Sequence, residues 1–222
     1  MTILDPTSLV KTLDNINESY LQRKEISTDE ALKASRWIAA QQGEKGSYRG
    51  LFAPTATDFD HAIRLFTGEK LECASARHIM GQEAARAVWL LGREDSVVRE
   101  AYEKATHWMQ DEPGFQQVGM YCCGRCSLSY WRHYWVGEFK NKAAFISKGI
   151  QKMQGYRLGD GKWRVFPFFY AIYTLGDLDL EAARVELKYA QPAIERYLKV
   201  TRTDDYAKRK TSILRNVLAK IT

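Results

Sequence analysis

The sequence lacks the features that place a protein in or across a membrane. None of its apolar runs approaches the roughly 20 residues that a membrane-spanning helix needs. The opening residues, MTILDPTSLVKTL, lack the basic and then apolar pattern of a secretory signal. We therefore expect a cytoplasmic protein, in which the four cysteines are reduced thiols rather than a disulfide framework.

Proline and alternating β-branched residues are also scarce. The chain has five prolines among 222 residues, and long stretches carry apolar residues at helical spacing. These absences exclude a sheet and predict an all-α protein, a single helical domain over residues 1–222, with roughly ten helices. The predicted helices are one that carries Leu9 to Tyr20, one that Thr28 caps and that ends near Gln42, and those over 60–66, 75–91, 95–110, 120–136, 143–154, 166–175, 180–198 and 205–220, with a long loop over 43–59.

Acidic residues are few at the C-terminal end. From Arg196 to Thr222 there are eight basic residues and two acidic ones, whereas the preceding residues carry 25 of each sign. The residues before Arg196 carry no net charge, which argues against a nucleic-acid groove, so we expect no nucleic-acid partner. Residues 203–222 form a predicted basic amphipathic helix. Such a helix docks on its own domain or on a second copy, or it makes peripheral contact with an anionic membrane.

What the chain does contain is an irregular repeat. Over residues 34–49, 105–115 and 149–164, the end of a helix is followed by Gln and then by a loop with Gly and an aromatic residue. Trp37, Trp108 and Trp163 belong to these three copies. Glycine permits the sharp turn, and the aromatic ring fills the gap between neighbouring helical hairpins.

This unit resembles the QxxxGxW-type repeats of terpenoid cyclases and protein prenyltransferases, most closely at residues 42–48 and 160–163. The resemblance implies an α/α toroid, two concentric rings of helices around an apolar cavity. The chain is short for twelve helices, so an incomplete ring is implied, whose open edge favours a homo-oligomer such as a dimer. The implied function is binding of an apolar, isoprenoid-like or lipid-like ligand, with transferase or cyclase chemistry. The alternative is a non-catalytic interaction scaffold that retains the fold.

The first candidate for chemistry is the segment around Asp58, Asp60 and His61. It is similar to the DxDD motif of class II terpene cyclases, whose middle Asp protonates an alkene or epoxide. Asp58 and Asp60 match that motif, and His61 stands where another Asp is expected. The alternative is that Asp58 or Asp60 caps a helix starting at His61.

The second candidate is the pair Cys123 and Cys126, a CxxC that is typical of the start of a zinc site. Protein prenyltransferases hold zinc with an Asp, a Cys and a distant His, but here Gly124 replaces the Asp. On one continuous helix His133 lies about 10.5 Å along the axis from Cys126, too far to share an ion whose ligands lie about 2 Å away. The alternatives are cysteines packed in a core, or a redox or nucleophilic thiol activated by a helix N-terminus.

The third candidate is a set of aromatic and basic side chains. Aromatic residues recur on one helical face in 130–135 and again in 166–173, where they line a pocket or fill a core. Arginines beside the glycine-aromatic loops bind a diphosphate or carboxylate, or form structural ion pairs. The predicted ligand-binding residues are His78, Arg125, Tyr130, Tyr134, Trp163, Arg164 and Tyr170.

Overall fold

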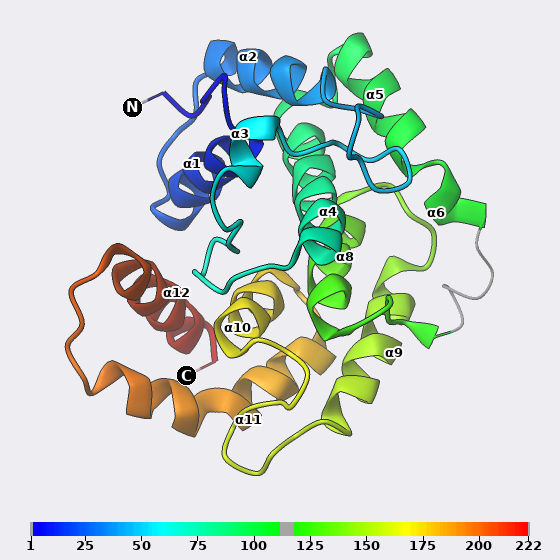
Figure 1. Cartoon of the computed structure of the whole chain (residues 1–222). Coiled ribbons are helices and arrows are strands. Elements are labelled where there is room, and N and C mark those ends of the chain that lie inside the picture. The colour runs from blue at the N-terminus through cyan, green and yellow to red at the C-terminus, as the bar shows by residue number, and fades with distance from the viewer. Residues whose placement is uncertain (1, 112–117, 222) are drawn as a thin grey trace. The chain divides into compact units, whose positions relative to one another are not determined.

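The computed structural model describes residues 2–111 and 118–221, and every regular element in these residues is a helix (Figure 1). The predicted all-α class is therefore confirmed, since the described part of the chain contains isolated β-bridges but no strand. Among the same residues, no helix combines the length and the apolar composition needed to cross a membrane. Contacts divide the chain into an N-terminal unit, residues 2–65, 70–111 and 136–139, and a C-terminal unit, residues 66–69, 118–135 and 140–221.

The N-terminal unit is built around one long helix. Its elements are α1 (Leu9–Leu21), α2 (Thr28–Ala39), α3 (Ala56–Phe59), α4 (Cys73–Gly92), α5 (Ser96–Thr106) and α6 (Trp108–Asp111). Helix α4 packs against α1, α2 and α5, and α2 also contacts α5. At the end of α4 a side chain on Gly92 would lie 2.4 Å from the Oγ atom of Ser35. The absence of a side chain there lets α2 and α4 approach closely.

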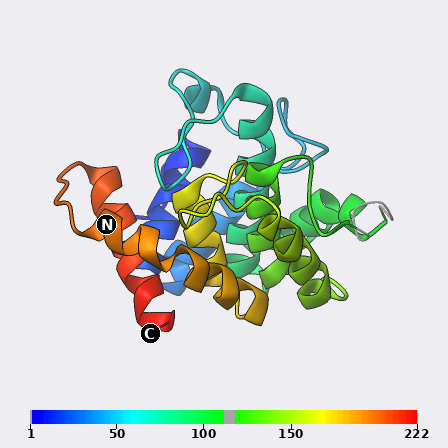
Figure 2. The same ribbon diagram turned by 90° about the horizontal axis from the view of Figure 1, so that it is seen from below.

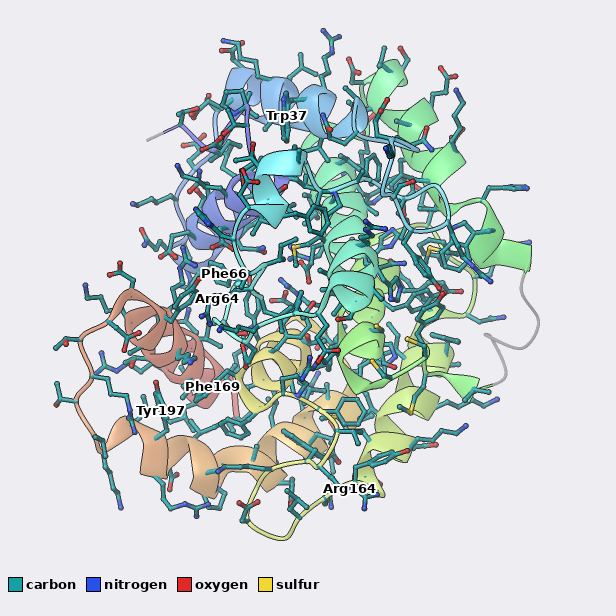
Figure 3. The ribbon with its side chains drawn as sticks, in the orientation of Figure 1. Trp37, Arg64, Phe66, Arg164, Phe169 and Tyr197 are labelled. Atoms are coloured by element: carbon teal, nitrogen blue, oxygen red, sulfur yellow. The ribbon has the colours of Figure 1, made fainter. Side chains whose placement is uncertain are left out.

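The C-terminal unit contains α8 (Gly124–Val136), apart from its last residue, and α9 (Lys142–Gln154), α10 (Phe168–Asp177), α11 (Glu181–Leu198) and α12 (Asp205–Ile221). Helices α10, α11 and α12 pack against one another, and α9 packs against α11 (Figures 1 and 2). Phe169 of α10 and Tyr197 of α11 point toward one another, with ring centroids 4.8 Å apart (Figure 3).

The predicted amphipathic helix over 203–222 is α12. Its apolar residues Ile213, Leu214 and Val217 are buried, and α12 contacts both α10 and α11. The Nζ atom of Lys220 donates to the carbonyl of Gly176 at 2.6 Å, which ties the last turn to α10. The apolar stripe thus docks within its own unit, and contact between the basic face and a membrane stays a prediction.

One predicted helix is wrong. Residues 61–67 are irregular, and the short helix α3 lies instead in the segment 43–59 that was expected to be a loop. The reason is the side chain of Asp58, which accepts a hydrogen bond from the Thr55 N–H at 2.8 Å and closes a capping box on α3. Cap positions elsewhere moved by a residue: the N-cap of α2 is Ser27, and Thr28 is the first helical residue.

Several other boundaries differ from the prediction: α2 ends at Ala39 rather than near Gln42, α4 is longer than the expected 75–91, and α10 lies two residues later than the expected 166–175. The helix expected over 95–110 is divided at His107 into α5 and α6. The helix expected from residue 120 begins at Gly124, and residues 120–123 before it are irregular. The predicted stop at Pro113-Gly114 and the second repeat loop, Gly114-Phe115, lie outside the described residues.

Candidate functional site at the N-terminus of α8

Three cysteines meet where α8 begins. Cys123 precedes the first helical residue, and its carbonyl accepts the Ser127 N–H at 2.9 Å, so Cys123 occupies the N-cap position. Cys122 and Cys123 are exposed and Cys126 is buried, and all three are free thiols. The sulfurs of Cys122 and Cys126 lie within 4.8 Å of each other. We call Cys122, Cys123 and Cys126 the cysteine turn.

The sulfur of Cys123 takes the place of the usual capping oxygen. Its neighbours are the side chain of Cys126 and the backbone N–H groups of Cys126 and Arg125. Ser, Thr, Asp or Asn normally accept from the N–H groups at these two positions of a helix. Hydrogen bonding to the Cys126 side chain, with smaller contributions from the Cys126 N–H, the Cys122 side chain and the Arg125 N–H, lowers the pKa of Cys123 to about 5.

The other two thiols are held in the protonated form. The hydrogen bond between Cys126 and Cys123 raises the pKa of Cys126, and burial raises it further. Burial also raises the pKa of Cys122. The turn therefore combines one exposed thiolate, that of Cys123, with a buried thiol beside it.

Ser127 fixes the backbone of the cysteine turn. Its Oγ atom accepts the Tyr121 N–H at 2.9 Å and donates to the carbonyl of Cys123 at 2.8 Å. The side chain of Ser127 is buried, so these bonds are protected from water. Gly124 is the point where another loop approaches, because a Cβ atom there would lie 2.3 Å from the carbonyl oxygen of Val165.

The chain that leads into the turn is anchored as well. The indole N–H of Trp131 on α8 donates to the carbonyl of Gly119 at 2.8 Å. Gly119 has a φ of +72°, a conformation that favours glycine, and it contacts Gly149 of α9 so closely that a Cβ atom would lie 2.4 Å from the Gly149 nitrogen. The cysteine turn is thus held by α8 and α9 as well as by its own hydrogen bonds.

Asp58 of the predicted acid motif acts as a helix cap in the structure. The carboxylate of Asp58 accepts from the Leu9 N–H at 3.0 Å, from the Ser8 hydroxyl at 2.5 Å and from Thr55, so it caps both α1 and α3. It does not cap a helix at His61, since that helix is absent. Asp60 and His61 are exposed, and the Nδ1 atom of His61 lies 2.8 Å from the carbonyl oxygen of Asp60. Acid catalysis by this segment stays a prediction.

The predicted aromatic ligand residues of the C-terminal unit pack among other rings. Tyr130 and Tyr134 lie with ring centroids 5.7 and 5.0 Å from that of Phe145. Tyr170 is 1% exposed. Trp163 is 3% exposed, and its indole N–H donates to the carboxylate of Glu186 at 2.8 Å.

Tyr134 also lines a surface hollow of about 210 Å³, together with Lys140, Asn141, Ala144, Phe145 and Lys148. This hollow lies at the start of α9. It includes none of the other predicted ligand-binding residues.

The predicted polar ligand residues lie in different places. Arg125 follows Gly124 on α8, and Arg164 is exposed in the loop before α10, with its guanidinium 5.7 Å from the centroid of the Tyr156 ring. His78 belongs to α4 of the N-terminal unit, where its ring lies 4.6 Å from that of Tyr48. Burial lowers the pKa of His78 to about 3, with a further contribution from the charge of Arg49, so the imidazole is neutral at pH 7.

Known proteins offer no assignment for this chain, since no family model, curated protein or solved structure matches it. The chemistry of the cysteine turn must therefore be argued from its own geometry. Sequence reasoning identified Cys123 and Cys126 but missed the contributions of Cys122 and Ser127. Each is four residues from a partner, Cys122 from Cys126 and Ser127 from Cys123, and that spacing at a helix start was the available signal.

Proposed function

We propose that this protein carries out thiol–disulfide exchange through Cys123 and Cys126. The observation that carries the proposal is that an exposed cysteine at the N-cap position of α8, Cys123, is followed three residues later by a buried free thiol, Cys126. An attacking thiol must be exposed and ionised, and a resolving thiol must lie beside it. These two cysteines meet both requirements.

The exchange runs in two steps. The Cys123 thiolate attacks one sulfur of a substrate disulfide, a mixed disulfide forms, and the first substrate thiolate leaves and takes a proton from water. The Cys126 thiol then gives its proton to water and attacks the Cys123 sulfur, which releases the second substrate thiolate. The substrate disulfide is reduced to two thiols, and the Cys123–Cys126 pair is oxidised to a disulfide. A small thiol reductant returns the pair to the dithiol.

The local backbone suits the second step. Residues three apart at a helix start are neighbours, with Cβ atoms about 5–6 Å apart in a regular helix, so a small adjustment brings them to the roughly 4 Å of a disulfide. Ser127 accepts from the Tyr121 N–H and donates to the Cys123 carbonyl, which keeps the turn in place as the sulfurs move. Neither of the two steps uses the sulfur of the third thiol, Cys122, as a nucleophile.

The test is to trap the mixed disulfide. The reduced chain is mixed with 2-hydroxyethyl disulfide and the products are mapped by peptide mass spectrometry. We expect a Cys123–Cys126 disulfide in the native chain, a stable mixed disulfide on Cys123 in Cys126→Ser, and neither product in Cys123→Ser. Cys73→Ser, which removes the one cysteine of the sequence outside the cysteine turn, is the matched control and should behave as the native chain does. A mixed disulfide that forms on Cys122 while Cys123 stays unreacted would overturn the proposal.

The remaining expectations from the sequence are separate proposals. The toroid arrangement, the isoprenoid-like or lipid-like ligand and a homo-oligomer rest on the resemblance in the glycine-aromatic loops. Native mass spectrometry of the purified chain tests the last two, through a co-purifying lipid and the assembled mass. A zinc ion on Cys123 and Cys126 is a competing use of the same thiols, which elemental analysis of the purified chain detects.

A further inference from the structure

The two segments beside the cysteine turn carry no negative charge. Residues 118–137, which include the turn and α8 with its next residue, contain no Asp or Glu, and neither do residues 161–176. The segments are neighbours in the C-terminal unit, because Gly124 contacts the carbonyl of Val165. Arg125 directly follows Gly124 in the chain, and Arg164 directly precedes Val165 (Figure 3 labels Arg164).

Other cations of these segments are neutralised by nearby carboxylates. Arg132 pairs with Asp177 at 2.9 Å, and Lys162 lies 3.8 Å from a carboxylate oxygen of Asp160. Within the described residues, by contrast, neither Arg125 nor Arg164 has a carboxylate partner. Two positive charges without a carboxylate partner among the described residues therefore belong to the residues next to the Gly124–Val165 contact, which lies directly after Cys123 in the chain.

We infer that the cysteine turn acts on anionic disulfides, those formed by small thiols that carry carboxylates. The inference rests on the exchange proposed above and adds the substrate class. Uncompensated cations beside a reactive group raise the local concentration of an anionic reactant and its rate of encounter. They disfavour the approach of a cationic disulfide to the same sulfur.

Salt separates this attraction from differences in substrate size. Charges that act over several ångströms in water are screened at high ionic strength, where the Debye length falls from about 10 Å at 0.1 M to about 3 Å at 1 M. A preference that arises from Arg125 and Arg164 should therefore fade with added salt. A preference that arises from the shape or intrinsic reactivity of the disulfide should not.

The experiment compares three disulfides of different charge: oxidised glutathione, 2-hydroxyethyl disulfide and cystamine. Their rates with reduced Cys126→Ser are each divided by the rate with free 2-mercaptoethanol under the same conditions. We expect oxidised glutathione to exceed cystamine about tenfold at low salt and about twofold or less in 1 M salt.

The matched variants locate the charge. The double variant Arg125→Gln, Arg164→Gln should lose most of the preference at low salt. Arg184→Gln removes an exposed arginine that already pairs with Asp179, and it should keep the preference. Equal normalised rates for the three disulfides, or a preference that survives both salt and the double variant, would refute the inference while leaving the exchange itself intact. If Cys123 reacts with none of the three, the proposed exchange fails instead.

Discussion

We expect the Cys123 thiol to react with an alkylating reagent at nearly the same rate at pH 6 and at pH 8. The perturbation is pH, and the reaction is alkylation of the reduced chain with iodoacetamide, followed at each cysteine by peptide mass spectrometry. Because the hydrogen bonds from Cys126 and the helix N–H groups lower the pKa of Cys123 to about 5, its thiolate persists as the pH falls and is lost only near that value. Iodoacetamide reacts with the thiolate and not with the thiol.

The magnitude follows from two opposing effects. At pH 6 an ordinary thiol, with a pKa of about 8.5, is roughly 0.3% ionised, whereas a thiol with a pKa of about 5 is roughly 90% ionised. The ionised fraction of Cys123 at pH 6 is therefore about 300-fold larger than that of an ordinary thiol. The thiolate of a more acidic thiol is a weaker nucleophile, and this lowers the rate advantage about 40-fold. Cys123 should therefore react roughly eight times faster than an ordinary thiol at pH 6, and roughly ten times slower at pH 8.

The ratio of the rates at the two pH values is the decisive quantity, because steric hindrance that is independent of pH cancels from it. An ordinary thiol speeds up roughly 70-fold from pH 6 to pH 8, and Cys123 should change by about 10%. Free glutathione in the same reactions supplies the reference. If the alkylation rate of Cys123 rose tenfold per pH unit, the assignment of Cys123 as a thiolate at the N-cap position would be refuted. In Cys126→Ala the loss of the donated hydrogen bond should raise the pKa of Cys123 and steepen the profile.

Three further predictions concern stability, each measured as the free energy of unfolding in urea. Asp58→Ala should cost about 2–3 kcal/mol, because N–H groups of α1 and α3 lose their acceptor; a cost below about 0.5 kcal/mol would contradict this capping role. Gly149→Ala should cost about 1–3 kcal/mol, since its Cβ would lie 2.0 Å from the Gly119 carbonyl oxygen. Gly155→Ala, whose nearest contact is 3.4 Å, is the control, and equal effects of the two would refute the packing argument. Trp163→Phe should cost about 1–2 kcal/mol by removing a donor to buried Glu186, and an unchanged stability would refute that.

Much of the secondary structure was predictable because the sequence signals for a helix lie within the helix and at its ends. The helices over residues 142–154 and 181–198 were expected within one residue of their observed bounds, since their apolar periodicity and end signals lie within the elements themselves. The helix expected over 60–66 failed for the opposite reason. The Asp58 carboxylate accepts from Thr55 in the capping box of α3, and it also accepts from Ser8 and Leu9 at the start of α1, about 50 positions earlier in the chain, a contact that has no local signal.

The candidate site shows the same division. The spacing of Cys123 and Cys126 was visible, and a helix N-terminus was recognised as one way to activate a thiol. That Cys123 is exposed while Cys126 is buried was not visible, because exposure depends on what packs over the turn. The contact between Gly124 and Val165 brings together segments about 40 positions apart, and no local pattern predicts it.

The sequence by itself determined that this chain is helical and that it carries a dithiol motif at the start of a helix, because both follow from residues within a turn or two of one another. The tertiary structure decided which sulfur is exposed, which aspartate is occupied as a cap, and which arginines lack a carboxylate partner among the described residues. Those properties depend on contacts between distant segments, and such contacts form only when the chain has buried its apolar faces.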